Sequence, residues 1–151
     1  MDAILISWDP EPDEVEEVKR HLDHYEYYWR VRFRIASSRF TFPMVGYVHM
    51  KGRRVEYMLT IADIVPFSPA HYELAAPVIP KLWIREWNET PPNERIPWKN
   101  ELVITKIEPF SFDTYLFRKY DDTPVKHPPE GFTRVLPPGE PTKGQAEQDP
   151  T

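Results

Sequence analysis

Residues 29–65, WRVRFRIASSRFTFPMVGYVHMKGRRVEYMLTIADIV, contain three strand patterns in succession and decide the fold. Over residues 29–35 apolar and basic side chains alternate strictly, which is typical of a half-buried strand. Residues 44–50 and 55–65 are two further strand-like runs, and the short basic sequence KGRR between them predicts a hairpin turn. Because a short turn joins antiparallel strands, this stretch predicts the centre of a mostly antiparallel sheet.

The segment before this stretch predicts one more strand and a helix. Residues 3–8 form an apolar strand pattern, and a proline-rich turn at residues 9–12 follows. Beyond the turn, four apolar residues recur at helical spacing: Val15, Val18, Leu22 and Tyr25. The acidic residues at the start of this segment suit a helix N-terminus.

The C-terminal half adds loops and further elements. Seven prolines within residues 66–100 predict an ordered loop around a short element at residues 82–87. After this region come a strand candidate at 101–107, a short helical or irregular segment at 112–120 and a closing strand at 132–136.

These elements sum to five or six strands, one clear helix and short helical pieces. The predicted fold class is α+β, with a mixed, mostly antiparallel β-barrel and flanking helices. The chain has 151 residues, enough for one hydrophobic core, and we place that domain at residues 1–136. Residues 137–151 are predicted to be a disordered Pro-rich tail.

The composition and the motifs exclude several classes of protein. Without cysteine there is no disulfide framework, thiol nucleophile or cysteine-ligated zinc, and no phosphate-binding glycine motif is present. His21 and His24, together with Glu17, lack the closed geometry of a structural zinc site. The N-terminus has no signal-peptide or membrane-spanning pattern, so a cytoplasmic location without membrane contact is expected. We predict no metal, no cofactor and no catalytic residue.

Charge is distributed unevenly along the chain. The formal net charge is -5, but residues 28–54 carry +7 and contain no Asp or Glu, which leaves -12 for the remainder. Seven residues supply this positive charge: Arg30, Arg32, Arg34, Arg39, Lys51, Arg53 and Arg54. Two interpretations stay open here, a solvated basic strand that offsets an acidic helix and an anion-binding surface.

The five tryptophans are the most informative residue type. Trp83, Trp87 and Trp98 lie in the Pro-rich region, whereas Trp29 lies in a strand pattern that usually buries a large aromatic side chain. Aromatic walls beside a positive surface can hold an unstacked base, because stacking contributes ~1–3 kcal/mol per base while Arg and Lys engage phosphate. A methyl group on the base adds apolar burial of roughly 0.8 kcal/mol, so such a pocket discriminates modified bases.

The order of these motifs resembles the PUA-like superfamily, in particular its EVE and YTH branches, over residues 3–136. The opening ILISWDPEPDEVEEV is similar to the EVE strand, turn and helix, and Trp29 stands where the YTH family places its first cage tryptophan. GYVHMKGRRVEYMLTIADIV resembles the paired central strands, and IPWKNELVITKIEPF resembles a YTH segment in which Trp-Lys-Gly precedes a strand. The tripeptide TPV at 123–125, with Glu130 beyond it, resembles a Pro-Val segment followed by an acid that accepts from the base edge.

This resemblance implies a mixed β-barrel that binds a modified base in RNA or DNA, with Trp29, Trp98 and either Trp83 or Trp87 as cage walls. It extends to the DNA-reading N-terminal domains of McrB-type restriction systems. Such systems imply a fused or associated effector, for example an AAA+ GTPase or a nuclease. DNA and RNA both stay open as the bound nucleic acid.

Our leading hypothesis is a non-catalytic module that reads a modified base, for example a methyladenine, flipped into an aromatic pocket. The predicted base-binding residues are Trp29, Trp83, Trp87, Trp98, Ser7 and Glu130. The predicted phosphate-binding residues are Arg30, Arg32, Arg34, Arg39, Lys51, Arg53 and Arg54.

Three alternatives stay open. A PUA-like RNA-binding module without selectivity for modification would use the basic hairpin alone, with the tryptophans in the core. An ASCH-type amidohydrolase acting on a modified nucleoside would use Lys106 and Glu108 of the sequence TKIE. A protein-interaction domain would pair its acidic helix and basic hairpin with partners.

Overall fold

One curled, seven-stranded sheet and three α-helices make up the part of the chain that the computed structural model describes, residues 1–8, 11–50, 52 and 54–139. The strands are β1 (Ala3–Ser7), β2 (Tyr27–Val31), β3 (Met44–His49), β4 (Arg54–Pro66), β5 (Asn100–Asp113), β6 (Arg118–Lys119) and β7 (Phe132–Leu136). The helices are α1 (Pro12–Leu22), α2 (Ala70–Glu73) and α3 (Lys81–Glu89). The predicted basic residues Lys51 and Arg53, and residues 140–151 of the predicted tail, lie outside the described residues.

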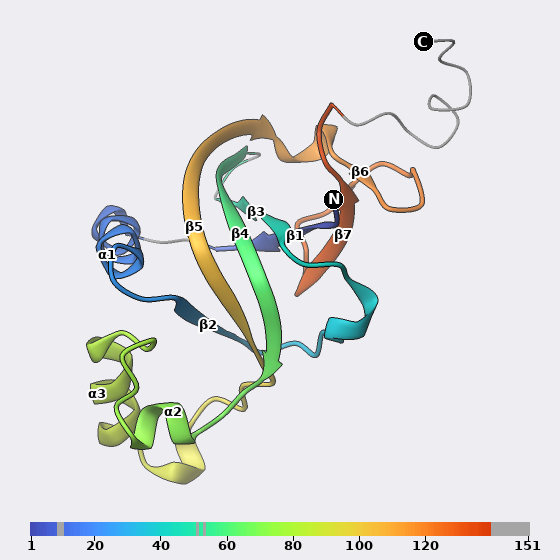
Figure 1. Cartoon of the computed structure of the whole chain (residues 1–151). Coiled ribbons are helices and arrows are strands. Elements are labelled where there is room, and N and C mark those ends of the chain that lie inside the picture. Colours follow the sequence, from blue (N-terminus) through green and yellow to red (C-terminus); the bar gives the residue numbers. More distant parts are fainter. Residues whose placement is uncertain (9–10, 51, 53, 140–151) are drawn as a thin grey trace, which may run out of the picture.

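The strands are ordered β2-β5-β4-β3-β1-β7-β6 across the sheet. Within the described residues β1 and β3 pair parallel, and the other neighbouring strands pair antiparallel. The prediction of an α+β domain with a mostly antiparallel sheet and flanking helices is thus confirmed. In Figure 1 the long strands β4 and β5 curve strongly, and α1, β2 and α3 lie on the same side of them.

The sheet does not close into a barrel, so the predicted barrel of five or six strands is wrong. Among the described strands, the edge strands β2 and β6 do not pair with each other. β2 is a short edge strand, and its pairing with β5 ends at Asn100. There the side-chain Oδ1 atom of Asn100 accepts the N–H of Ile35 at 3.1 Å. A side chain thus provides the hydrogen bond that a neighbouring strand would otherwise supply.

The strand predicted over residues 29–35 pairs only as far as Val31. Its alternation nevertheless continues beyond the end of β2. Val31 and Ile35 are buried, whereas Arg32 and Arg34 are exposed. The periodicity therefore predicts the faces of this segment correctly, although its hydrogen-bonded part is shorter than expected.

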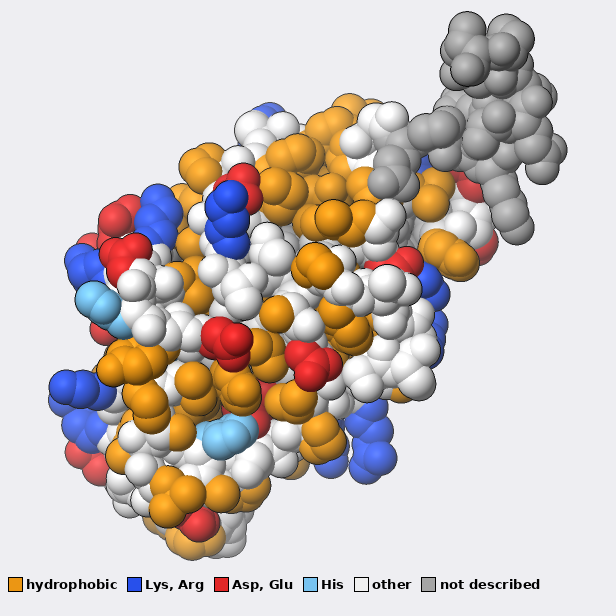
Figure 2. All heavy atoms as spheres, in the orientation of Figure 1, with side chains coloured by type: hydrophobic (Ala, Val, Ile, Leu, Met, Phe, Trp, Pro, Cys, Tyr) orange, Lys and Arg blue, Asp and Glu red, His pale blue; other side chains and the backbone are white. Residues whose placement is uncertain are grey.

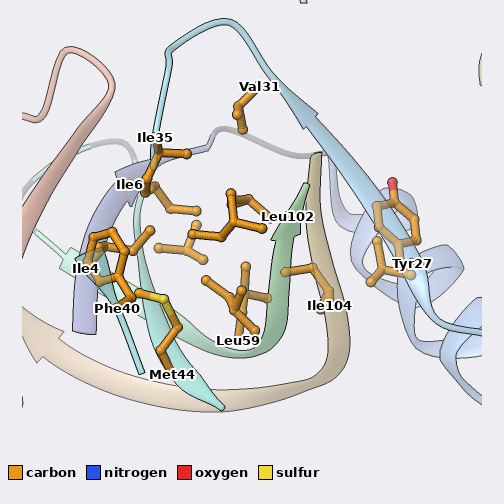
Figure 3. Packing of buried hydrophobic residues seen from close by; sticks show 14 residues of the cluster. Ile4, Ile6, Tyr27, Val31, Ile35, Phe40, Met44, Leu59, Leu102 and Ile104 are labelled. Carbon is orange, nitrogen blue, oxygen red and sulfur yellow. The ribbon is translucent and has the colours of Figure 1, made fainter. Parts of the chain in front are cut away.

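The main hydrophobic core lies inside the curve of the sheet. Figure 3 shows Ile4, Ile6, Leu59, Leu102 and Ile104 pointing toward one another from β1, β4 and β5. A second buried cluster involves β1, β3, β7 and the segment that follows β5. The register shifts between β4 and β5 allow these strands to bend and contribute to both clusters.

Gly46 of β3 marks a close approach within the main core. A Cβ atom at this position would lie 3.0 Å from Cδ1 of Ile61 on the neighbouring β4. We expect Gly46→Ala to lower the free energy of unfolding by about 1–3 kcal/mol, because the added methyl group overpacks a dense core. Urea denaturation measures this loss. Ile61→Val removes the Cδ1 atom, so the two losses should not add in the double variant, and simple additivity would contradict the packing explanation.

The Pro-rich region contains two helices rather than one short element. The element predicted at residues 82–87 is α3, which is longer, and α2 is not predicted. Pro69 and Pro80 directly precede α2 and α3, where a missing N–H breaks no helical hydrogen bond. A third buried cluster around Tyr72 and Trp87 joins the two helices.

A buried carboxylate fastens this helical unit to the sheet. Glu101 of β5 is 0% exposed. Its Oε1 atom accepts the Ser68 N–H at 3.0 Å and lies 2.9 Å from Nδ1 of His71, while Oε2 has no hydrogen-bond partner among the described residues. Burial raises the pKa of the Glu101 carboxyl above its ordinary value, although the contacts with Ser68 and His71 oppose this shift.

The C-terminal elements match the prediction in part. β7 is the strand predicted at residues 132–136. β5 continues well beyond the predicted 101–107, because it stays paired with β4 along nearly its whole length. The segment predicted to be helical or irregular at 112–120 forms the end of β5, a short 3-10 turn at Thr114–Leu116 and β6.

Candidate functional site, an aromatic cleft

A cleft of about 650 Å³ opens between α1, β2 and α3. Four aromatic side chains that line it are Trp8, Tyr27, Trp29 and Trp83. Figure 2 shows hydrophobic side chains at the surface between α1 and α3, with charged side chains of both signs beside them. A cleft of this volume is in the size range of pockets that hold small molecules.

The local structure explains how these rings meet. Alternation along β2 places Tyr27 and Trp29 on one face, with their ring centroids 6.3 Å apart. Trp8 follows β1, and its backbone N–H donates to the His49 carbonyl oxygen at 3.0 Å. Its ring stands edge-on to that of Trp29, with the ring centroids 4.6 Å apart. Trp83 of α3 meets Tyr27 edge-on at 5.3 Å. The three indoles are half-buried, so part of each stays accessible.

One face of α1 forms a polar wall of the cleft. Glu14, Glu17 and His21 recur at i, i+3 and i+7, and all three line the cleft. The Nε2 atom of His21 lies 3.0 Å from the Glu26 carbonyl oxygen. The His21 ring stands edge-on to Tyr27 at 5.2 Å. This wall is therefore held against the aromatic floor by direct ring contact.

Charges of both signs act at the floor of the cleft. Burial raises the pKa of the Tyr27 phenol well above its ordinary value, and the positive charge of Arg30 opposes this shift. The carboxylates of Glu14 and Glu17 raise the same pKa further. Both carboxylates are thus close enough to Tyr27 to affect a charge there.

The rim of the cleft carries both signs of charge. In addition to its two glutamates, α1 contributes Arg20 and His24. The facing wall contributes Lys81 and Glu86 of α3. The rim is therefore not the cationic border that the basic stretch of the sequence predicts.

Arg30, a predicted phosphate contact, is largely buried between two indoles. Its guanidinium carbon lies 4.3 Å from the centre of the Trp83 ring and 4.6 Å from that of Trp98. A guanidinium nitrogen lies 3.6 Å from a Glu86 carboxylate oxygen, and the Arg30 side chain is only 14% exposed. Arg30 therefore braces α3, and with it Trp83, against β2.

Trp87 and Trp98, two predicted base-binding residues, do not line the aromatic cleft. They line a separate pocket of about 220 Å³, which Arg30 also borders. Trp87 is 9% exposed and packs on Tyr72, with ring centroids 4.9 Å apart. The structure thus brings Trp29 together with Trp83 and places the other two predicted tryptophans elsewhere.

Ser7 and Glu130, the remaining predicted base contacts, lie near each other at the end of β1. The Ser7 hydroxyl donates to the Pro129 carbonyl oxygen at 3.2 Å, and Ser7 and Glu130 are both exposed. Neither lines the cleft. Ser7 lies two residues after Leu5, on the side of β1 that faces the second buried cluster, whereas the next residue, Trp8, lines the cleft.

The other described basic residues are divided between two places. Arg32, Arg34 and Arg39 are exposed on the segment that follows β2. Arg54 is exposed at the start of β4, where it donates to the Ser111 hydroxyl. β3 ends at His49, which pairs with Ser7 at the end of β1. The basic stretch therefore forms two groups, and none of its described members lines the cleft.

No family model matches this chain. No curated protein and no solved structure matches it either. The candidate site is therefore identified from its own residues and their geometry.

The sequence-based site does not include Trp8, Tyr27 or the polar face of α1. The helical repeat of Glu14, Glu17 and His21 is a signal that these residues share a face. The packing of α1 against β2 then turns that face into a cleft wall, and the sequence carries no signal for this contact.

Other candidate chemistry lies outside the cleft. Lys106 and Glu108, the residues of the amidohydrolase alternative, form an ion pair at 2.9 Å on β5 and line neither pocket. Within the described ranges, no group of three or more His, Asp and Glu side chains is arranged to hold a metal ion. In the same part of the chain, no helix is both long and apolar enough to cross a membrane.

Proposed function

We propose that this domain binds a single base of DNA or RNA in the aromatic cleft and reads whether that base is modified, without catalysing a reaction. The observation that carries the proposal is the convergence of Trp8, Trp29 and Trp83 from separate elements on one open cleft. Stacking on aromatic side chains contributes about 1–3 kcal/mol per base. A base enters such a cleft only after leaving its own stack.

Selectivity for a methylated base follows from the same rings. A methyl group that contacts an indole is removed from water, which contributes roughly 0.8 kcal/mol. Trp8 and Trp29 are already packed edge to face, so binding costs little freedom of these side chains. The proposed cage consists of Trp29 and Trp83 with Trp8, in place of Trp87 and Trp98.

The exposed basic residues supply the proposed phosphate contacts. Arg32, Arg34 and Arg39 follow β2, and Arg54 begins β4. In this proposal the phosphates of a nucleic-acid strand bound at the cleft contact these basic groups. Ser7 and Glu130 would then contact a neighbouring nucleotide.

The proposal includes a PUA-like, EVE/YTH-type origin of the domain. Its support is the order of elements, a strand, a helix and a tryptophan-bearing strand followed by the β3–β4 hairpin. The open sheet departs from the barrel of that superfamily. An associated effector such as an AAA+ GTPase or a nuclease remains part of the proposal.

Titration of a labelled single-stranded oligonucleotide, followed by fluorescence anisotropy at low salt, tests the function. We expect a methylated oligonucleotide to bind about 4-fold tighter than its unmodified counterpart, as one buried methyl group predicts. Trp29→Ala and Trp83→Ala should each weaken binding about 10-fold or more, because each removes a stacking surface.

Tyr120→Ala is a suitable control, because Tyr120 is an exposed aromatic residue outside the cleft. Its replacement should leave the affinity unchanged. Equal affinity for methylated and unmodified oligonucleotides would contradict the reading of a modification. Losses as large for Tyr120→Ala as for the two tryptophan variants would contradict the cleft as the site.

A further inference from the structure

The carboxylates of the aromatic cleft indicate the charge of its ligand. Glu14 and Glu17 lie on the cleft face of α1, and Glu86 lies on the facing wall formed by α3. Among the described residues neither Glu14 nor Glu17 has an ion-pair partner, whereas Glu16 of the same helix pairs with Lys19. Glu86 is shared with Arg30 at 3.6 Å. Glu14 and Glu17 thus lie beside an aromatic floor without an ion-pair contact of their own among the described residues.

Two cations also line the cleft, Arg20 and Lys81. Arg20 lies at the edge of the row formed by Glu14, Glu17 and His21, three residues after Glu17 and beside it on the helix. Lys81 is the first residue of α3. Both side chains are exposed and long enough to keep their charges in water. They are placed to meet a phosphate at the rim rather than a base on the floor.

We infer that the modified base is a purine that methylation leaves positively charged, of which 7-methylguanine is the type. This inference rests on the function proposed for the same cleft. A cation over an indole face is attracted by the quadrupole of the ring, and tryptophan is the strongest partner of this kind. The exposed carboxylates of Glu14 and Glu17 add a Coulomb attraction, which solvent partly screens. A neutral base such as N6-methyladenine gains neither contribution.

The shape of the cleft favours a base over a methylated ammonium group. Trp8 and Trp29 stand edge to face at 4.6 Å, and Tyr27 and Trp83 do so at 5.3 Å. These rings form a broad wall, whereas a methylammonium group is bound in a narrow aromatic box. The volume of about 650 Å³ leaves room for a flat ring and its sugar.

Isothermal titration with free nucleotides tests this inference. The ligands are 7-methylguanosine 5′-monophosphate, guanosine 5′-monophosphate, N6-methyladenosine 5′-monophosphate and adenosine 5′-monophosphate, in slightly acidic buffer where 7-methylguanine is cationic. We expect 7-methylation to increase affinity about 10-fold or more, and N6-methylation to increase it less.

Two double variants of α1 test whether Glu14 and Glu17 cause the preference for 7-methylguanosine monophosphate. Glu14→Gln/Glu17→Gln removes both charges from the cleft and should reduce the preference for 7-methylguanosine monophosphate to about 2-fold or less. Asp13→Asn/Glu16→Gln changes the net charge equally on the same helix, and these side chains are exposed like those of Glu14 and Glu17 but do not line the cleft. This control should keep the preference.

The outcomes separate this inference from the proposed function. A larger gain from N6-methylation than from 7-methylation would overturn the inference while leaving a base-reading cleft in place. Absence of binding by all four nucleotides and by methylated oligonucleotides would overturn both. Binding of a trimethyllysine peptide without binding of 7-methylguanosine monophosphate would assign the cleft to a protein ligand and would also overturn both.

Discussion

Replacement of Glu101 by alanine is expected to lower the free energy of unfolding by about 3 kcal/mol. The carboxylate is fully buried and accepts the Ser68 N–H while it faces Nδ1 of His71. Alanine would leave the Ser68 N–H without its partner and would open a cavity at the junction of α2 with the sheet. Urea denaturation followed by tryptophan fluorescence measures the loss.

Glu101→Gln is the matched control, because it keeps an accepting oxygen and removes only the charge. It should cost less than about 1 kcal/mol at neutral pH. A loss as large as that of Glu101→Ala would show that the charge, rather than the hydrogen bond, holds α2 in place.

The free energy of unfolding of the wild-type protein and of Glu101→Gln, measured as a function of pH, gives a further check on the role of Glu101. Burial is the main cause of its raised pKa, and the facing His71 and the Ser68 N–H lessen the shift. A raised pKa in the folded state means that the stabilising contribution is complete below the ordinary value of 4.5 and is lost as the pH rises through the folded value. The wild-type protein should therefore lose stability relative to Glu101→Gln as the pH rises above 4.5. A difference that does not change with pH would contradict this account.

Replacement of Arg30 by alanine is expected to lower the free energy of unfolding by about 2 kcal/mol and to weaken ligand binding. The guanidinium lies against the rings of Trp83 and Trp98 and pairs with Glu86, so its loss separates α3 from β2. Because Trp83 is a wall of the cleft, a loosened α3 also disturbs the binding site. Thermal unfolding and oligonucleotide titration measure the two effects.

Arg30→Lys and Arg32→Ala distinguish bracing from phosphate binding. Lysine keeps the charge but not the planar guanidinium, so it should recover only part of the lost stability. Arg32 is exposed, and Arg32→Ala should change stability by less than about 0.5 kcal/mol while it reduces the salt dependence of binding by about one phosphate contact. The opposite pattern, a reduced salt dependence for Arg30→Ala with unchanged stability, would make Arg30 a phosphate ligand.

Local patterns predict much of this fold. Alternation of apolar and basic residues identifies β2 and the buried side of the segment up to Ile35. The runs around a short basic turn identify the β3–β4 hairpin, and residues 132–136 identify β7. In each case the signal lies within a few neighbouring residues, because a strand with one buried face requires a period of two.

Local sequence patterns predict less of the candidate site than of the fold. The aromatic composition indicates tryptophans near a surface, but Trp87 is buried under Tyr72 and only Trp29 and Trp83 of the predicted set share the cleft. The basic stretch predicts one positive surface. In the structure the Arg30 guanidinium packs against the rings of Trp83 and Trp98. The other described arginines of this stretch lie in two places, after β2 and at the start of β4.

The amino-acid sequence by itself determined the α+β class, the central hairpin and the buried side of the segment from Trp29 to Ile35, since these depend on the spacing of apolar residues along the chain. Only the tertiary structure decided that the sheet stays open, that Glu101 anchors α2, and that Trp8, Trp29 and Trp83 face one cleft. These features depend on contacts between residues far apart in the chain. Their energies arise from packing and burial at the junction of separate elements, which spacing along the sequence does not encode.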